Sequence, residues 1–183
     1  MNRRDALKRT ALIMGYAVSA STIAAVMQGC STSGDPDWMP TYLTKEQADL
    51  VAEIAEVIIP KTDTPGAKDA GVHQFVDTLF GGYMEEREKD ALLEGLAAVD
   101  EASQAAYSKN FVALSEEEKN AIIQKFADEA TRDSFFAQMK ELTLSGYFTS
   151  ELVGKNVLNY DPIPGDYKGC IDIAEVGNVN WTM

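Results

Sequence analysis

Five stretches between Thr44 and Glu151 carry apolar side chains at helical spacing, and this periodicity limits the possible folds more than any other feature of the chain. Apolar residues three and four positions apart share one face of an α-helix, whereas a half-buried β-strand alternates apolar and polar residues. Such alternation is nowhere convincing here. The sequence therefore predicts an all-α fold, with a single helical domain of about five helices over residues 44–153 and an extended, mostly irregular C-terminal arm over residues 154–183.

Caps and helix breakers set the expected ends of these helices. Thr44 with Gln47, and Ser115 with Glu118, match the capping box, in which the two side chains satisfy free backbone amides at a helix start. Pro60 ends the first helix because proline has no amide hydrogen to donate. The helices are expected to run from Thr44 to Pro60, from about Ala70 to Phe80 before a Gly81-Gly82 break, from about Glu85 to Tyr107, from Ser115 onward, and from about Asp133 to Glu151.

One apolar face of each helix is expected to point into a shared core. The residues on these faces are Leu50, Val51, Ile54, Val57 and Ile58, then Val72, Phe75, Val76 and Leu79, then Leu92, Leu96, Val99 and Ala106, then Ile122, Ile123, Phe126 and Ala130, and finally Phe135, Phe136, Met139, Leu142 and Tyr147. The opposite faces carry the acidic clusters at residues 85–86, 100–101 and 116–118, which we expect to be solvated.

The composition changes after Gly154. The segment from Leu158 to Cys170 holds two prolines, two glycines and two tyrosines in thirteen residues, which excludes a helix and favours an extended arm with turns. Beyond it, the tail is polar apart from five apolar residues, Ile171, Ile173, Val176, Val179 and Trp181. Such an ending either packs on its own domain or lies on another protein, and aromatic residues are enriched at interfaces. The sequence leaves both alternatives open.

Residues 1–29 have the parts of an export signal, with a basic start, an uncharged run from Ala11 to Met27 and small residues near the end. Arg3 and Arg4, followed by Leu7 and Lys8, resemble the signals of the twin-arginine route, which carries proteins that are already folded. The general secretory route is an alternative, since it also uses basic residues. An uncut membrane anchor is a weaker one, because a spanning helix needs about 20 strongly apolar residues.

Cys30 indicates a lipid anchor. The Gly29-Cys30 pair resembles a bacterial lipoprotein cleavage site, where the cysteine becomes the lipidated first residue. Residues 31–37 are polar and suit a flexible tether, so we assign residues 30–43 to the lipidated cysteine and its tether. The expected location is the periplasmic side of the bacterial cell envelope, lipid-anchored after twin-arginine export. Alternatively, Cys30 merely lies near an ordinary cleavage site.

The charge of the chain excludes several classes of partner. The formal net charge is −13, and removal of residues 1–29 takes away four basic residues and one acid, which leaves about −16. Nucleic acid is excluded as a partner because its phosphates would be repelled. Binding to anionic lipid through a cluster of basic residues is excluded for the same reason. If Cys30 is lipidated, Cys170 has no partner within the chain, which suggests a buried thiol or an intermolecular bridge.

Motifs for chemistry are missing from the sequence. There is no G-x-G-x-x-G fingerprint, no C-x-x-C-H haem site and no G-x-S-x-G elbow. The single histidine, His73, is interpreted as a structural hydrogen-bonding residue rather than a ligand or base. We therefore expect no catalytic, cofactor or metal site in this chain.

Two segments carry a family resemblance. Residues 54–67 with 70–77, and residues 144–151 with an arm that ends in Pro-Gly-x-Tyr-x-Gly-Cys at Cys170, resemble the gluconate 2-dehydrogenase subunit 3 family. The resemblance implies a small, non-catalytic subunit of a membrane-associated sugar or sugar-acid dehydrogenase. In such complexes a large subunit of the glucose–methanol–choline type holds FAD, and a cytochrome c subunit often takes the electrons. The small subunit carries the export signal and escorts the large one.

The first hypothesis is thus an escort and structural subunit of a flavin dehydrogenase. Its predicted interface consists of the loop after the first helix, the end of the last helix and the arm, with residues Pro60, Thr62, Pro65, Gly66, Tyr147, Phe148, Tyr160, Pro164, Tyr167 and Cys170. The second hypothesis is a free-standing periplasmic helical lipoprotein that binds a ligand or an envelope component. An enzyme in its own right is a remote third.

Overall fold

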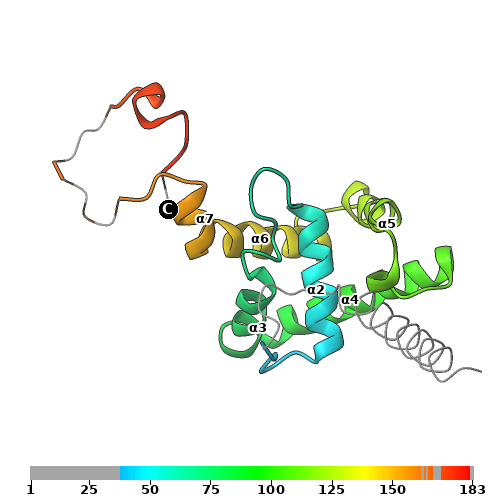
Figure 1. Ribbon diagram of the computed structural model, residues 1–183. Helices are drawn as coiled ribbons and strands as arrows, with labels where there is room; N and C mark the ends of the chain where they lie inside the picture. The colour runs from blue at the N-terminus through cyan, green and yellow to red at the C-terminus, as the bar shows by residue number, and fades with distance from the viewer. Residues whose placement is uncertain (1–37, 162, 164, 167–169, 182–183) are drawn as a thin grey trace, which may run out of the picture. The chain divides into compact units, whose positions relative to one another are not determined.

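Six α-helices and two short 3₁₀ helices make up the folded part of the chain in a computed structural model, which describes residues 38–161, 163, 165–166 and 170–181. The elements are α2 (Lys45–Ile58), α3 (Val72–Gly82), α4 (Glu86–Tyr107), η1 (Phe111–Ala113), α5 (Glu116–Asp128), α6 (Phe135–Phe148), α7 (Glu151–Asn156) and η2 (Ile173–Val176) (Figure 1). No strand occurs among these residues, so the predicted all-α class is confirmed. The predicted export signal (Arg3, Arg4, Leu7 and Lys8) and Cys30 lie outside the described residues, as do Pro164 and Tyr167.

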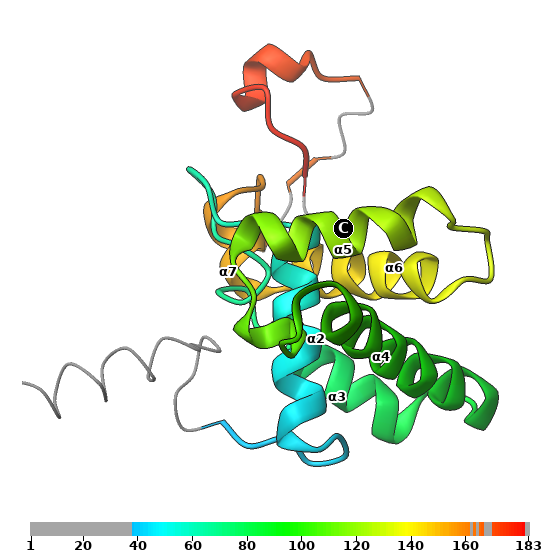
Figure 2. The same ribbon diagram turned by 90° about the vertical axis from the view of Figure 1, so that its right-hand side faces the viewer.

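Helix α2 lies at the centre of the core, where it contacts α3, α4, α5 and α6 (Figures 1 and 2). Val51, Ile54 and Ala55 of this helix are fully buried. The other helices contribute further buried side chains, among them Leu92, Phe111, Ile122, Met139 and Val153. The periodicity that predicted one inward face per helix therefore corresponds to a single shared core.

The predicted caps are confirmed. Thr44 accepts a hydrogen bond from the Gln47 amide at 3.2 Å, and the Gln47 side chain accepts one from the Thr44 amide at 2.9 Å. Ser115 and Glu118 exchange the same pair of bonds at 3.3 and 2.8 Å. These bonds satisfy amides that have no partner inside the helix.

Helix α3 differs from its prediction at both ends. It begins at Val72, because Gly71 adopts a left-handed conformation with a φ of 70° that glycine allows at little cost. It also continues through Gly81 and Gly82 instead of stopping at Phe80. Gly81 has a packing role, since a Cβ atom there would overlap the ring of Tyr42.

Two alanines predicted to face the core are exposed. The buried stripe of α4 passes from Val99 through Ser103 toward the half-buried Tyr107, so Ala106 falls on the solvent side. Ala130 lies beyond the end of α5 at Asp128 and is exposed as well. The prediction was wrong at both positions because each lies near or past a helix end, where the packing partner changes.

The predicted last helix is divided in two. Helix α6 ends at Phe148, and Ser150 begins the separate helix α7. The Ser150 backbone is extended (φ −69°, ψ 143°), and its hydroxyl accepts a hydrogen bond from the Val153 amide at 3.3 Å while donating one to the Tyr147 carbonyl at 2.8 Å. A serine in this conformation caps a new helix rather than continuing the old one.

The arm after α7 closes on itself through Asn159. The backbone amide of Asn159 donates to the Asn180 carbonyl at 2.8 Å, and its side-chain amide donates to the carbonyls of Val176 and Val179 at 2.8 and 2.6 Å. The large apolar side chains of the arm nevertheless stay exposed, and they are Tyr160, Ile163, Ile171, Ile173 and Trp181. In the part of the chain that the structure describes, no helix is both long and apolar enough to span a bilayer.

Candidate functional site

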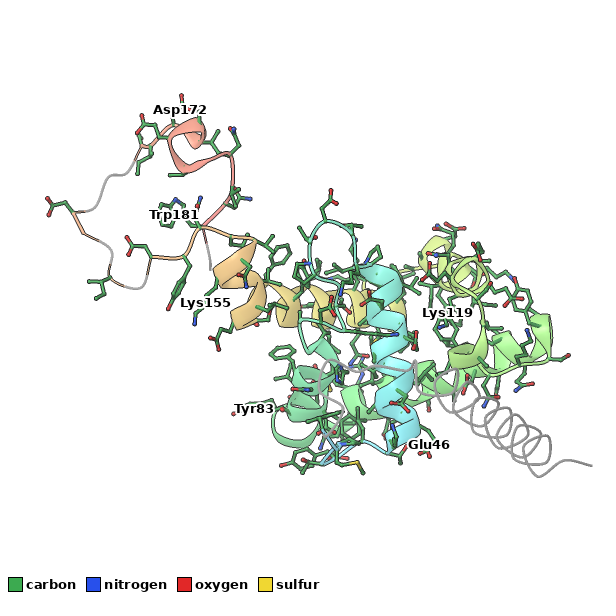
Figure 3. The ribbon with its side chains drawn as sticks, in the orientation of Figure 1. Glu46, Tyr83, Lys119, Lys155, Asp172 and Trp181 are labelled. Atoms are coloured by element: carbon green, nitrogen blue, oxygen red, sulfur yellow. The ribbon has the colours of Figure 1, made fainter. Side chains whose placement is uncertain are left out.

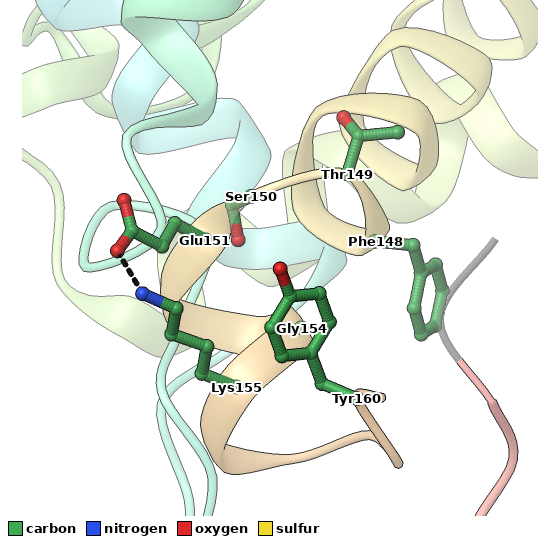
Figure 4. A pocket seen from close by; sticks show the side chains of 7 residues that line it. All are labelled: Phe148, Thr149, Ser150, Glu151, Gly154, Lys155 and Tyr160. Atoms are coloured by element: carbon green, nitrogen blue, oxygen red, sulfur yellow. Dashed lines mark hydrogen bonds and ion pairs between the residues drawn. The ribbon is translucent and has the colours of Figure 1, made fainter. Parts of the chain in front are cut away.

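Helix α7 separates two open grooves on the surface. The first, which we call the α7 groove, has a volume of about 480 Å³ and is lined by Phe148, Thr149, Ser150, Glu151, Gly154, Lys155 and Tyr160 (Figure 4). The second, which we call the loop groove, has a volume of about 450 Å³ and is lined by Lys61, Thr62, Asp63, Thr64, Pro65, Asp69 and Leu152. Together with the arm, these grooves gather most of the residues that the sequence predicted for an interface.

The α7 groove combines aromatic walls with a charged rim. Figure 4 shows the Tyr160 ring in front of Gly154, with Phe148 on one side and the charged pair of Glu151 and Lys155 on the other. Lys155 and Glu151 form an ion pair of 2.5 Å, and this hydrogen bond lowers the pKa of Glu151 and raises that of Lys155. Such a groove suits an apolar or aromatic side chain that carries a polar end, as protein interfaces commonly present.

The loop between α2 and α3, residues 60–71, is fixed from inside by Glu56. The carboxylate of Glu56 accepts hydrogen bonds from the amides of Lys61 and Lys68 at 3.0 and 2.8 Å. Gly66 lies directly on this carboxylate, where a Cβ atom would overlap it. The need for glycine at this position therefore comes from close packing.

Two further contacts hold the same loop from outside. The Tyr147 hydroxyl donates to the Pro65 carbonyl at 2.8 Å, which connects the loop to α6. Lys61 and Asp69 form an ion pair of 2.9 Å, and this hydrogen bond raises the pKa of Lys61 and lowers that of Asp69. The loop is thus held in one conformation before any partner arrives.

An ion triad around the buried Glu53 braces the base of the loop, and sequence reasoning missed it. Glu53 of α2 accepts from the ammonium groups of Lys68 at 2.6 Å and Lys119 at 2.8 Å. Burial works to raise the pKa of Glu53, but the hydrogen bonds from Lys119 and Lys68 outweigh it, so the pKa lies below its usual value. The triad joins α2, the loop and α5. Because Glu53 and Lys119 are 66 positions apart, no local pattern indicates the pair.

The predicted interface residues that the structure describes fall into four groups. Thr62 and Pro65 line the loop groove, with Pro60 exposed beside them, and Phe148 and Tyr160 line the α7 groove. Gly66 and Tyr147 are buried and support the loop, while Cys170 is exposed and has no disulfide among the described residues. The sequence analysis missed Glu151, Leu152 and Lys155. The signal that could have indicated them is Ser150, a helix-capping residue between two apolar runs, because it begins the helix on which all three lie.

His73 lies elsewhere and differs from its prediction. Its side chain is 1% exposed, and among the described residues neither ring nitrogen has a hydrogen-bond partner. The ring packs edge-on against Trp38, with centroids 4.9 Å apart. Burial lowers the pKa of His73 to about 4, which the charge of Asp49 offsets only in part. His73 is therefore a neutral core residue and was wrongly predicted to be a hydrogen-bonding one. No set of three side chains suited to a metal ion occurs in the described ranges.

Comparison with known proteins gives one match. A family model described as gluconate 2-dehydrogenase subunit 3 matches residues 45–165. The matched range covers α2 to α7 and the start of the arm, and so includes both grooves. No curated protein and no solved structure shows a significant match.

Proposed function

The chain belongs to the gluconate 2-dehydrogenase subunit 3 family, and from this premise we propose that it is the small, non-catalytic subunit of a FAD-dependent dehydrogenase of the glucose–methanol–choline type. In this proposal it escorts the large subunit through the twin-arginine route and stabilises it on the periplasmic side of the bacterial cell envelope. FAD and the sugar or sugar-acid substrate belong to the large subunit, and a cytochrome c subunit accepts the electrons.

The observation that carries the proposal is the surface formed by the loop groove, the α7 groove and the arm. We call this the docking surface. It combines exposed apolar residues of the arm, such as Tyr160 and Ile163, with a loop that internal contacts hold in place. Exposed apolar patches mark interaction sites, and a preorganised loop loses little conformational entropy on binding. This combination suits a lasting protein interface better than a transient one.

Cys170 offers a covalent addition to this interface. Its thiol is exposed on the arm, where it is accessible to a cysteine of the large subunit. The environment outside the cytoplasm is oxidising. There the two thiols would pass two electrons and two protons to the cell's disulfide-forming system, and the resulting disulfide would join the subunits. A Cys170→Ser variant would then leave the subunits separable in a non-reducing gel.

The signal residues support the export role. Arg3 and Arg4, with Leu7 and Lys8, precede the uncharged run, and Cys30 follows it. A receptor reads such a signal as an address, so one signal serves a folded complex of two chains. The proposed lipid on Cys30 then keeps the complex at the membrane.

The escort role is tested by replacing both signal arginines, as Arg3→Lys with Arg4→Lys. We expect both the small chain and the large flavin subunit to remain in the cytoplasm, because in this proposal the large subunit has no signal of its own. The matched control gives the large subunit a separate export signal, which should restore its export in the same variant. Normal export of the large subunit beside the double variant would contradict the escort role and favour a free-standing lipoprotein.

A further inference from the structure

We propose that a second surface, formed by Met39, Tyr42 and Tyr83, lies against the lipid bilayer when the chain is anchored. We call it the tether face, because the segment that follows Cys30 joins the folded domain there. The inference rests on the proposed lipidation of Cys30. It goes beyond the proposed function because it assigns a lipid-facing side to the helical domain itself.

Exposed large apolar side chains fall mainly into two groups among the described residues. One group belongs to the arm and hence to the docking surface. The other consists of Met39, Tyr42 and Tyr83, which are 68%, 56% and 77% exposed. Of the remaining two, at 37% each, Leu152 lines the loop groove and Leu144 lies on α6. The second group needs its own explanation, since it lines neither of the two grooves; Tyr83 lines a separate hollow with Met84 and Leu142.

Asp77 fixes the tether face to α3. This carboxylate is 3% exposed and accepts hydrogen bonds from the amides of Thr41, Tyr42 and Leu43 at 2.9, 3.0 and 2.7 Å. The Tyr42 ring lies on Gly81 near the end of α3, two positions before Tyr83. The three hydrogen bonds to Asp77 and the contact of Tyr42 with Gly81 thus hold the start of the folded domain against α3. The apolar side chains of both segments are therefore held in place.

The position of the tether decides what covers this face. Seven residues separate Cys30 from Trp38, so the anchored cysteine stays within about 28 Å of the tether face even if the segment is fully extended. The loop between α2 and α3 (residues 60–71), which we call the docking loop, begins at the other end of α2 (Figures 1 and 2), about 21 Å farther along for a helix of 14 residues. The tether face is therefore the part of the described domain at which the chain that follows Cys30 enters.

The chemistry of the tether face also suits a bilayer surface. Tyrosine has an apolar ring and a polar end, and it is enriched where membranes meet water. The charged residues near these side chains in the sequence are of both signs, with Lys45 and Arg87 beside Glu46 and Glu85. Contact would therefore depend on apolar insertion rather than on attraction to anionic lipid. Figure 3 shows Tyr83 and Glu46 at the end of the domain away from Lys155 and Trp181.

An environment-sensitive fluorescent label at position 83 tests this inference. The full chain would be made in its native host with Cys170→Ser, so that Tyr83→Cys supplies one thiol beside the lipidated Cys30. The matched control is Glu101→Cys, on an exposed position of α4. In membranes, the label at position 83 should shift to the blue and lose emission when the vesicles contain brominated lipid. The label at position 101 should do neither.

Three results would overturn the inference, and they differ in what else they affect. A membrane-bound chain whose label at position 83 behaves as in water leaves the anchor intact and rejects the tether face. A blue shift without quenching by brominated lipid means that a protein covers the face. Recovery of the chain in the soluble fraction rejects the lipid anchor as well. The proposed role as a dehydrogenase subunit is tested independently of these three results, by the flavin content of the purified chain.

Discussion

Three carboxylates of the domain, two of them buried and one half-buried, each hold a different segment in place. Asp77 binds three amides of the segment before α2, Glu56 binds two amides of the docking loop, and Glu53 binds the ammonium groups of Lys68 and Lys119. Hydrogen bonds to an ionised acceptor are roughly twice as strong as neutral ones. At the scale of single residues, the acids that stabilise the fold are therefore those that bind backbone amides or lysines of other segments.

Glu53→Gln should destabilise the domain strongly. The variant leaves Lys68 and Lys119, whose side chains are 20% and 12% exposed, without a charged partner. Breaking a buried ion pair costs about 3 to 5 kcal/mol, and chemical denaturation would measure the loss in the free energy of unfolding. The control is Lys45→Ala, which breaks the exposed pair with Asp49 and should cost about 0.5 kcal/mol or less. Equal effects of the two variants would contradict the bracing role.

His73 should make the domain less stable as the pH falls from 7 to 5. Because its pKa is about 4 in the folded state and about 6.5 when unfolded, the unfolded chain binds the proton first. Stability is therefore full above pH 6.5 and decreases below it, by about 2 kcal/mol at pH 5. Since His73 is the one histidine of the chain, a His73→Leu variant should show a flat free energy of unfolding over this range. A slope that persists in the variant would assign the effect to another group.

At the scale of elements, the docking loop depends on the absence of a side chain at Gly66. Gly66→Ala should force the Glu56 carboxylate away from the two amides that it binds. Loss of these bonds should lower the free energy of unfolding by about 1 to 3 kcal/mol. Gly82→Ala is the matched control, because a Cβ atom there meets nothing within 4 Å. If the two variants unfold at the same denaturant concentration, the loop is not held through Glu56.

Elements defined by local chemistry could be predicted from the sequence. The capping boxes at Thr44 and Ser115, and the stop at Pro60, depend on residues within one turn of each other. The periodicity also gave the buried faces, except at Ala106 and Ala130 near helix ends. The separation of α6 from α7 was missed, because Ser150 is compatible with both a continuing helix and a cap until its backbone conformation is known.

The docking surface was only partly predictable, for a physical reason. Its loop and arm residues carry turn-forming and aromatic signals that are visible in the sequence. Its supports connect distant segments, as with Tyr147 and Pro65, which are 82 positions apart. Long-range pairs of this kind follow from packing and leave no periodic pattern. The sequence therefore indicated which residues could meet a partner, but not which residues hold them.

At the scale of the whole molecule, the helical domain separates two kinds of contact. The docking surface lies at the C-terminal end of α2, and the tether face lies at its N-terminal end (Figure 1). A large subunit bound to the docking surface would consequently leave the tether face free for the bilayer. The proposed role of a small subunit that holds a large flavin subunit at the envelope would account for this separation.

The most direct test of the central proposal is purification of the tagged chain from its native membrane fraction, followed by a flavin absorbance spectrum. We predict a yellow complex with a second, larger chain. Tyr160→Ser in the α7 groove should weaken retention of that chain by about tenfold, in keeping with an aromatic interface residue, whereas Tyr83→Ser at the tether face should retain it fully. A colourless chain recovered alone would contradict the proposal and favour a free-standing lipoprotein.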